Sequence, residues 1–195
     1  MTVLDLSLNT EAFFSSLIEQ AVSRQELELS EEVRLYLIKL LVLNASSGGV
    51  MEQSTKLLDE TPLSIVYLEA MNEPSSLKRI KFKFIADYSL YLLGFFGDSL
   101  NGKIIDPACY IMLGTNCFAN LSSITRDAKT SYLYSQMLYS FPDLVEVLTE
   151  VSFDTMVSSS QDLMRLYKRW LRTGSKVLER KLMEKGMISP GTTKA

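Results

Sequence analysis

A chain of 195 residues that is 47% hydrophobic can bury a large core, and its composition excludes global disorder. The net charge of -3 is too small to indicate nucleic-acid binding by the molecule as a whole. The sequence contains no histidine, so the commonest general base, zinc ligand and haem ligand are missing. Without histidine ligands we expect no metal or other cofactor. Ser-His-Asp and Cys-His catalytic groups are also excluded, so an enzyme is the less favoured class.

The first residues, MTVLDLSLNTEAFF, include two acids and lack the basic and apolar regions of a signal peptide. The expected location is therefore the cytoplasm. Cys109 and Cys117 fall on one predicted helix, about 12 Å apart along its axis, which is too far for a disulfide. We expect two free thiols that behave as small hydrophobic residues.

Apolar residues recur every three or four positions along most of the chain, and no persuasive pair of strands appears. Residues 51–60 fit either a short helix or an ordered loop. The sequence predicts an all-α fold: a single-domain bundle of about eight helices over residues 1–188, followed by a flexible tail over 189–195. The predicted helices span about 10–25, 31 to the stop at Gly48-Gly49, 62–71, 76–96, 107–124, 126–140, 143–156 and 160–185.

Several helix starts have clear capping signals. Thr10 is the expected cap of the first helix, and Ser30 precedes two glutamates at the start of the second. Asp106 before Pro107 predicts a cap followed by proline at the first helical position. Gly97 and the residues after it predict a turn between two apolar helices.

Those two helices, 76–96 and 107–124, form an apolar helical hairpin in the sequence. A membrane hairpin is one interpretation, but Asp87 interrupts the first segment, and Thr115, Asn116 and Asn120 dilute the second. A helix that is apolar on nearly all sides also suits the centre of a bundle. We expect the bundle, with no transmembrane segment.

The same hairpin contains the candidate ligand site, in which a small apolar ligand would lie between helices 76–96 and 107–124. Asp87 lies one turn before Tyr91, so the two side chains are spaced to hydrogen-bond. A structural role, in which Asp87 locks buried helices together, is the simpler interpretation. The candidate ligand-binding residues are Asp87, Tyr91, Gly94, Tyr110 and Gly114.

The predicted last helix has one apolar and one basic face. From Gln161 to Ala195 there are nine Lys or Arg against three Asp or Glu, a net charge of +6. Such a helix can pack on the bundle with a solvated basic face, lie beside the acidic N-terminal helices, or bind an acidic partner, an anionic membrane surface or RNA. The candidate interaction surface consists of Arg165, Lys168, Arg169, Arg172, Lys176 and Arg180.

Four stretches together are similar to an uncharacterised bacterial all-helical family with no known activity. They are DYSLYLLGFFGDSL, DPACYIMLGTNCFANLS, FPDLVEVLTEVS and LMRLYKRWLRTGSKVLERKLMEKGMISP, within residues 77–190. Leu93 stands where the family pattern has a serine, which weakens any role for a hydroxyl at that position. The resemblance implies a helical bacterial protein of the cytoplasm and supplies no activity.

Two hypotheses follow from the sequence. The leading one is a non-enzymatic protein that acts by protein–protein association or self-association, through the basic last helix or an exposed aromatic patch, without specific nucleic-acid recognition. The alternative is a protein that binds a small apolar ligand, with Asp87, Tyr91 and Tyr110 as polar anchors.

Overall fold

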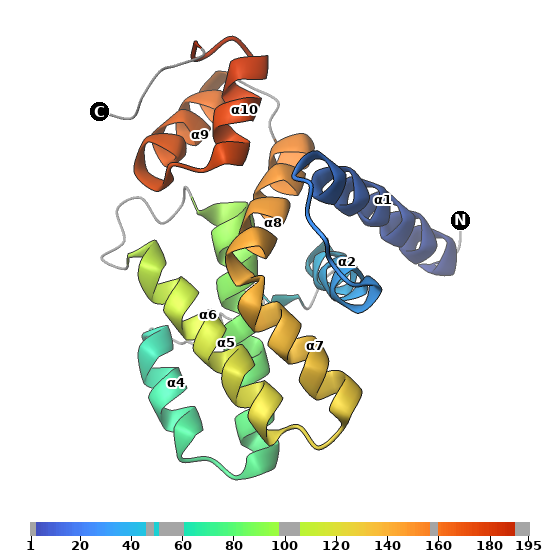
Figure 1. The fold of residues 1–195 in the computed structure, drawn as a ribbon, viewed down its shortest axis with the longest axis vertical. Coiled ribbons are helices and arrows are strands. Elements are labelled where there is room, and N and C mark those ends of the chain that lie inside the picture. The colour runs from blue at the N-terminus through green and yellow to red at the C-terminus, as the bar shows by residue number, and fades with distance from the viewer. Residues whose placement is uncertain (1–2, 46–48, 51–60, 98–105, 157–159, 190–195) are drawn as a thin grey trace.

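The computed structural model describes residues 3–45, 49–50, 61–97, 106–156 and 160–189. Every regular element in this part of the chain is a helix, which confirms the predicted all-α class (Figure 1). The helices are α1 (Val3–Arg24), α2 (Glu31–Ala45), α4 (Leu63–Met71), α5 (Ser75–Phe96), α6 (Pro107–Ile124), α7 (Ala128–Tyr139), α8 (Phe141–Met156), α9 (Ser160–Thr173) and α10 (Lys176–Glu184).

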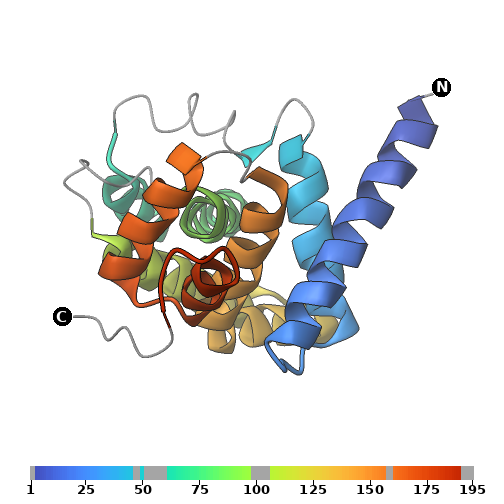
Figure 2. The same ribbon diagram turned by 90° about the horizontal axis from the view of Figure 1, so that it is seen from above.

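Helix α5 is the centre of the bundle. Every residue from Phe84 to Phe95 is buried, because α5 packs against α4, α6 and α8 and its apolar residues point to all three. Figure 2 looks along α5 and shows the other helices arranged around it. The apolar hairpin of the sequence is therefore the middle of a helical core, as expected.

The boundaries of α4 to α8 lie within two residues of the predicted ones. The strongest signal has the expected geometry: Asp106 Oδ1 accepts a hydrogen bond from the Ala108 amide at 3.0 Å, with Pro107 at the first position. The ambiguous segment 51–60, the stop at Gly48, most of the turn after Gly97 and the tail beyond Ser189 lie outside the described residues.

Two expected boundaries are wrong. Helix α1 begins at Val3, so Thr10 lies inside it and does not cap it. The single helix expected over 160–185 is two helices, because Gly174 takes a φ of 67° that ends α9. Ser175 then caps α10, its Oγ accepting from the Leu178 amide at 3.2 Å.

Helices α9 and α10, which we call the C-terminal hairpin, have an apolar cluster of their own. The buried members of this cluster are Phe153, Leu166, Trp170, Leu178 and Leu182. The main core is a separate cluster that includes Ile18, Leu37, Ile85 and Leu148. Within the described residues, Phe153 is the one buried member of the hairpin cluster that belongs to α8.

Candidate functional site

Asp87 lies on α5 and is 5% exposed. Its Oδ1 accepts a hydrogen bond from the Tyr36 hydroxyl of α2 at 2.5 Å, and its Oδ2 lies 2.5 Å from Lys83 Nζ. Lys83 Nζ also lies 4.9 Å from the centre of the Tyr36 ring. The sequence predicted Tyr91 as the hydrogen-bond partner of Asp87. In the structure the tyrosine that donates to Asp87 is Tyr36, and this bond joins α5 to α2.

Burial dominates the ionisation of this group. It raises the pKa of Asp87 above its ordinary value, although Lys83 and the Tyr36 hydroxyl both act to lower it. Burial, and then the charge of Asp87, raises the pKa of Tyr36 well above its ordinary value. The three side chains therefore form a compact polar cluster between two helices, in which burial and the Lys83 ammonium act on the pKa of Asp87 in opposite directions.

A hollow of about 220 Å³ opens beside this cluster, between α2 and α5. Its lining residues are Tyr36, Lys39, Leu40, Leu43, Lys83 and Asp87. Lys83 has 48% of its side chain exposed at this position, whereas Asp87 has 6%. A small ligand in this hollow would meet leucine side chains and the lysine ammonium before it met the carboxylate.

Tyr91 and Tyr110, the two tyrosines among the candidate ligand residues, contact other aromatic rings. The Tyr91 ring stacks on Phe95 with centroids 4.9 Å apart, and the Tyr110 ring lies 6.5 Å from that of Tyr88. Both residues are buried, and burial raises the pKa of Tyr110 to about 12. They act here as aromatic core residues.

The two predicted glycines let helices approach closely. A Cβ at Gly94 would lie closer than 3.0 Å to the Leu148 side chain of α8, and a Cβ at Gly114 equally close to the Phe141 ring. The space beside each glycine is therefore filled by a neighbouring helix, which leaves none for the edge of a ligand.

The expected position for a ligand, between α5 and α6, does contain a hollow of about 230 Å³, but only at one end of these helices. Leu93, Gly97, Pro107 and Ile111 line it together with residues of α8 and α9. None of the five candidate ligand residues is among its lining residues. The structure thus does not place the candidate ligand residues around this hollow.

Part of the predicted basic surface is internal. Arg169 is 4% exposed, and its guanidinium donates to the carbonyl oxygens of Leu93 at 2.5 Å and Gly94 at 3.1 Å and to Thr149 Oγ1 at 2.8 Å. Arg172 donates to the carbonyl of Gly97. The last carbonyls of α5 have no partner within that helix, so these two arginines cap it from α9.

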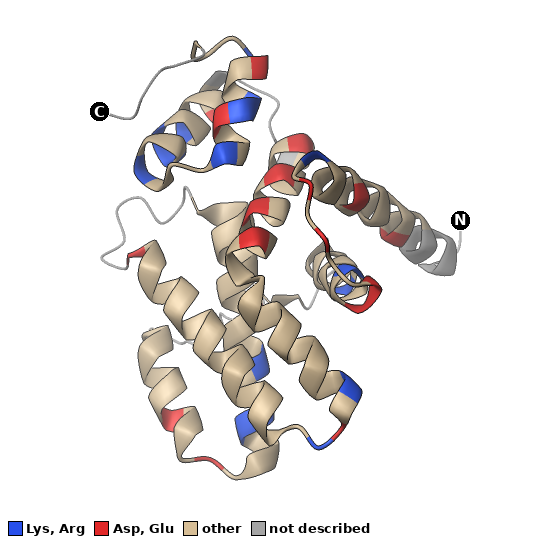
Figure 3. Ribbon diagram, in the orientation of Figure 1, with Lys and Arg blue, Asp and Glu red and all other residues tan. Residues whose placement is uncertain are grey.

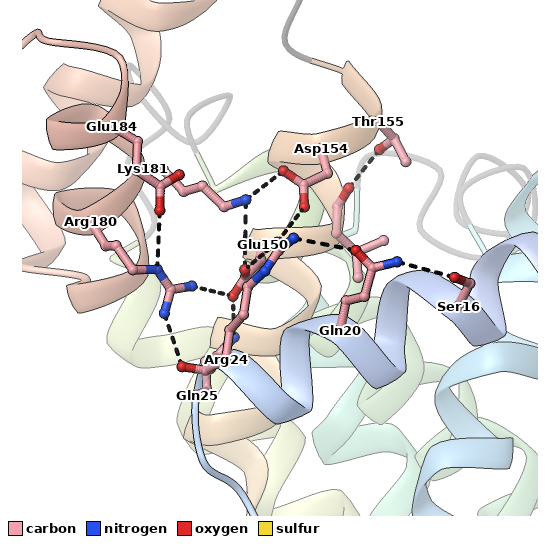
Figure 4. A network of polar contacts seen from close by, with 11 residues as sticks. Ser16, Gln20, Arg24, Gln25, Glu150, Asp154, Thr155, Arg180, Lys181 and Glu184 are labelled. Atoms are coloured by element: carbon pink, nitrogen blue, oxygen red, sulfur yellow. Dashed lines mark hydrogen bonds and ion pairs between the residues drawn. The ribbon is translucent and has the colours of Figure 1, made fainter.

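Glu150 of α8 has a fully buried side chain and lies within 4.0 Å of three cationic side chains (Figure 4). Oε1 lies 3.0 Å from Arg24 Nη1 and 3.6 Å from Lys181 Nζ. Oε2 accepts from Gln25 at 2.9 Å and from Arg180 at 2.6 Å. One carboxylate therefore joins α1, α8 and α10.

Sequence reasoning missed Glu150 and its role. The available signal was the spacing of Glu146, Glu150 and Asp154, one acid per turn on the same helix. Such a row needs water or polar partners, which Ser175, Arg180 and Lys181 supply together with Arg24 of α1. One prediction placed the basic helix beside the acidic N-terminal helices. In the structure the acids that α10 binds lie on α8.

The exposed charged side chains of the hairpin, which we call its outer face, are mainly basic. Figure 3 shows basic residues grouped on α9 and α10, with acidic residues along the neighbouring α8. Arg165 pairs with Asp162 on its own helix. Between Ser160 and Ser189 the exposed charged side chains are five cations and one acid: Arg165, Lys168, Arg172, Lys176 and Lys185, against Glu184.

Both cysteines are free thiols, as expected, and burial raises the pKa of Cys117. Among the described residues, no group of three or more cysteines and acids is placed to hold a metal ion. None of the described helices is long and apolar enough to cross a membrane.

The fold and these contacts define an all-helical bundle with a helical hairpin attached by buried ionic contacts. Comparison of the chain with models of protein families, with curated proteins and with solved structures found no match.

Proposed function

We propose that this chain is a non-enzymatic protein that acts by binding another protein, and that the outer face of the C-terminal hairpin is its binding surface. The observation behind this proposal is that the exposed charged side chains of the hairpin are five cations and one acid. An acidic protein surface is the complementary partner, because opposite potentials raise the association rate and disfavour other partners.

Apolar contact area on the same helix supports the proposal. Met164 is 49% exposed and Leu171 is 40% exposed, and both lie on α9 within one turn of Lys168. Methionine and arginine are enriched in protein interfaces, and long lysine stems add apolar area. The face can therefore combine hydrophobic contact with charge recognition.

The two buried carboxylates support binding over catalysis. The oxygens of Asp87 lie beside Tyr36 of α2 and Lys83 of its own helix, and those of Glu150 beside donors from α1 and α10. A general base must lie within reach of its substrate, and both of these side chains are buried. The bacterial, cytoplasmic setting implied by the resemblance belongs to this same proposal.

The test is affinity capture on purified protein with a charge-reversed outer face. Lys168→Glu combined with Lys185→Glu should abolish capture of the acidic partner, which mass spectrometry identifies. The matched control is Lys39→Glu combined with Lys129→Glu, two exposed lysines on α2 and α7. Equal capture by the wild-type protein and the outer-face variant would refute the proposed surface.

A second candidate function is the binding of a small apolar ligand in the hollow beside Asp87. The supporting observation is the mostly apolar lining of this hollow of about 220 Å³, with Lys83 at its mouth. Native mass spectrometry of the purified protein should then show a bound mass that is lost on denaturation. Leu43→Trp should fill the hollow and remove that mass.

A further inference from the structure

The C-terminal hairpin is attached to α8 by a row of matched polar contacts. Glu146 accepts from Ser175 Oγ at 2.5 Å, Glu150 from Arg180 at 2.6 Å, and Asp154 from Lys181 at 2.6 Å. The acids are four residues apart on α8, and their partners follow in the same order along α10. We call Ser175, Arg180 and Lys181 the inner face of the hairpin.

An aromatic contact completes the attachment to α8. Phe153 of α8 enters the apolar cluster of the hairpin beside Trp170 and Leu178. Lys181 Nζ lies 5.3 Å from the centre of the Phe153 ring, within the range of a cation–π contact. The inner face thus binds one helix with three acids at one-turn spacing and one aromatic ring beside them.

The hairpin has its own apolar cluster, so its two helices share an apolar contact that does not depend on the main core. Its ties to the rest of the protein are the Phe153 contact and a set of ionic and polar contacts, including the capping of α5 by Arg169. Elements of this kind open at lower free energy than a main core does. The inner face is therefore a binding face that another helix of the same chemistry could occupy.

We infer that the inner face of the C-terminal hairpin binds an acidic amphipathic helix with an aromatic residue on its acidic side, and that α8 occupies this face as an internal competitor. This inference rests on the proposed function, since it gives the acidic partner a helix and a second contact face. Because α8 belongs to the same chain, it competes at an effective concentration of about millimolar, and the partner binds only when it outcompetes α8.

The experiment uses a labelled peptide of residues 143–156 as the probe. Four core-facing residues are replaced by alanine, so that the peptide cannot enter the main core: Leu144→Ala, Val147→Ala, Leu148→Ala and Val151→Ala. The comparison peptide also has its acidic row neutralised by Glu146→Gln, Glu150→Gln and Asp154→Asn. Fluorescence anisotropy measures binding of each peptide to the full chain.

The full chain is tested as wild type and with Glu150→Gln, which weakens the internal competitor and leaves the inner face intact. We expect the acidic peptide to bind this variant roughly tenfold or more tightly than the wild type, and the peptide with the neutralised acidic row to bind neither. Binding should weaken from about 0.05 M to about 0.3 M salt. Glu19→Gln, which removes the surface pair with Arg34, is the control and should resemble the wild type.

Hydrogen exchange of the α10 amides reports whether the hairpin has opened. Faster exchange in the Glu150→Gln protein without tighter peptide binding overturns the inference, and so does equal binding of the two peptides. If Glu150→Gln does not fold, Asp154→Asn, at the more exposed end of the row, takes its place with the same expected order. Lys168→Glu tests the outer face separately, because it should reduce partner capture and leave peptide binding unchanged.

Discussion

The carboxylates of Asp87 and Glu150 are both buried, and both lie within bonding distance of cations. They differ in their surroundings. Asp87 has one lysine from its own helix and one tyrosine, whereas Glu150 has three cations from two other helices. Removing one partner of a buried pair leaves the other charge uncompensated, so both sites should be sensitive to substitution.

Asp87→Ala should lower the free energy of unfolding by about 1–3 kcal/mol, because the Tyr36 hydroxyl and Lys83 lose their shared acceptor. Urea denaturation followed by circular dichroism measures the change. Asp106→Ala, at an exposed helix cap, is the comparison and should cost about 1 kcal/mol. An Asp87→Ala protein as stable as the wild type would exclude the structural role.

The pH dependence of stability should show the raised pKa of Asp87. A folded-state pKa above the unfolded one stabilises the protein fully below the unfolded pKa, about 3.9 for aspartate, and this stabilisation is lost as pH rises through the folded value. Asp87→Asn removes the ionisation and keeps the shape. The stability of the wild type relative to this variant should fall as pH rises from about 4; a rising difference would contradict the sign.

At the scale of the helix, the end of α5 depends on a side chain from α9. The Arg169 guanidinium bridges the carbonyls of Leu93 and Gly94, which a lysine ammonium cannot do with the same planar geometry. Arg169→Lys should therefore cost about 1–3 kcal/mol in urea denaturation. The neighbouring exposed Lys168→Met should stay within about 0.5 kcal/mol, and equal effects of the two would refute the capping role.

The crossing of α5 and α8 depends on Gly94. Gly94→Ala should cost about 1–3 kcal/mol, because the added Cβ meets Leu148. Leu148→Ala alone leaves a cavity and should cost about 2–5 kcal/mol. The double variant should cost less than the sum of the two in thermal unfolding; simple additivity would show that the two side chains do not share this space.

The helices were predictable from sequence where a local signal coincided with the packing. The cap at Asp106 and the apolar run of α5 are such cases, since each depends on neighbours a few residues away. The break at Gly174 was missed because the amphipathic pattern continues through it. The burial of Arg169 was missed because a helical wheel shows one helix and not the end of α5 that this arginine caps. The hydrogen-bond partner of Asp87 could not be predicted from neighbouring residues, because Tyr36 lies 51 residues away in the sequence.

Across the whole molecule, the two apolar clusters predict two levels of stability. Amides of α10 should exchange with deuterium through a local opening of lower free energy than amides of α5. The reason is that the hairpin cluster is small and that ionic contacts help to hold the hairpin on α8. Native-state hydrogen exchange at low denaturant measures both. Identical opening free energies for the two helices would mean that the hairpin and the bundle unfold as one unit.

The cluster around Glu150 also sets an order of events during synthesis. Ribosomes make α1 and α8 before α10, so the growing chain first holds this acid with Arg24 and Gln25 alone. Arg180 and Lys181 arrive later, at about 5–20 residues per second, and only then is the carboxylate fully neutralised. A nascent chain that stalls between α8 and α10 would expose the acidic side chains and the Phe153 ring of α8 that the hairpin covers in the complete fold.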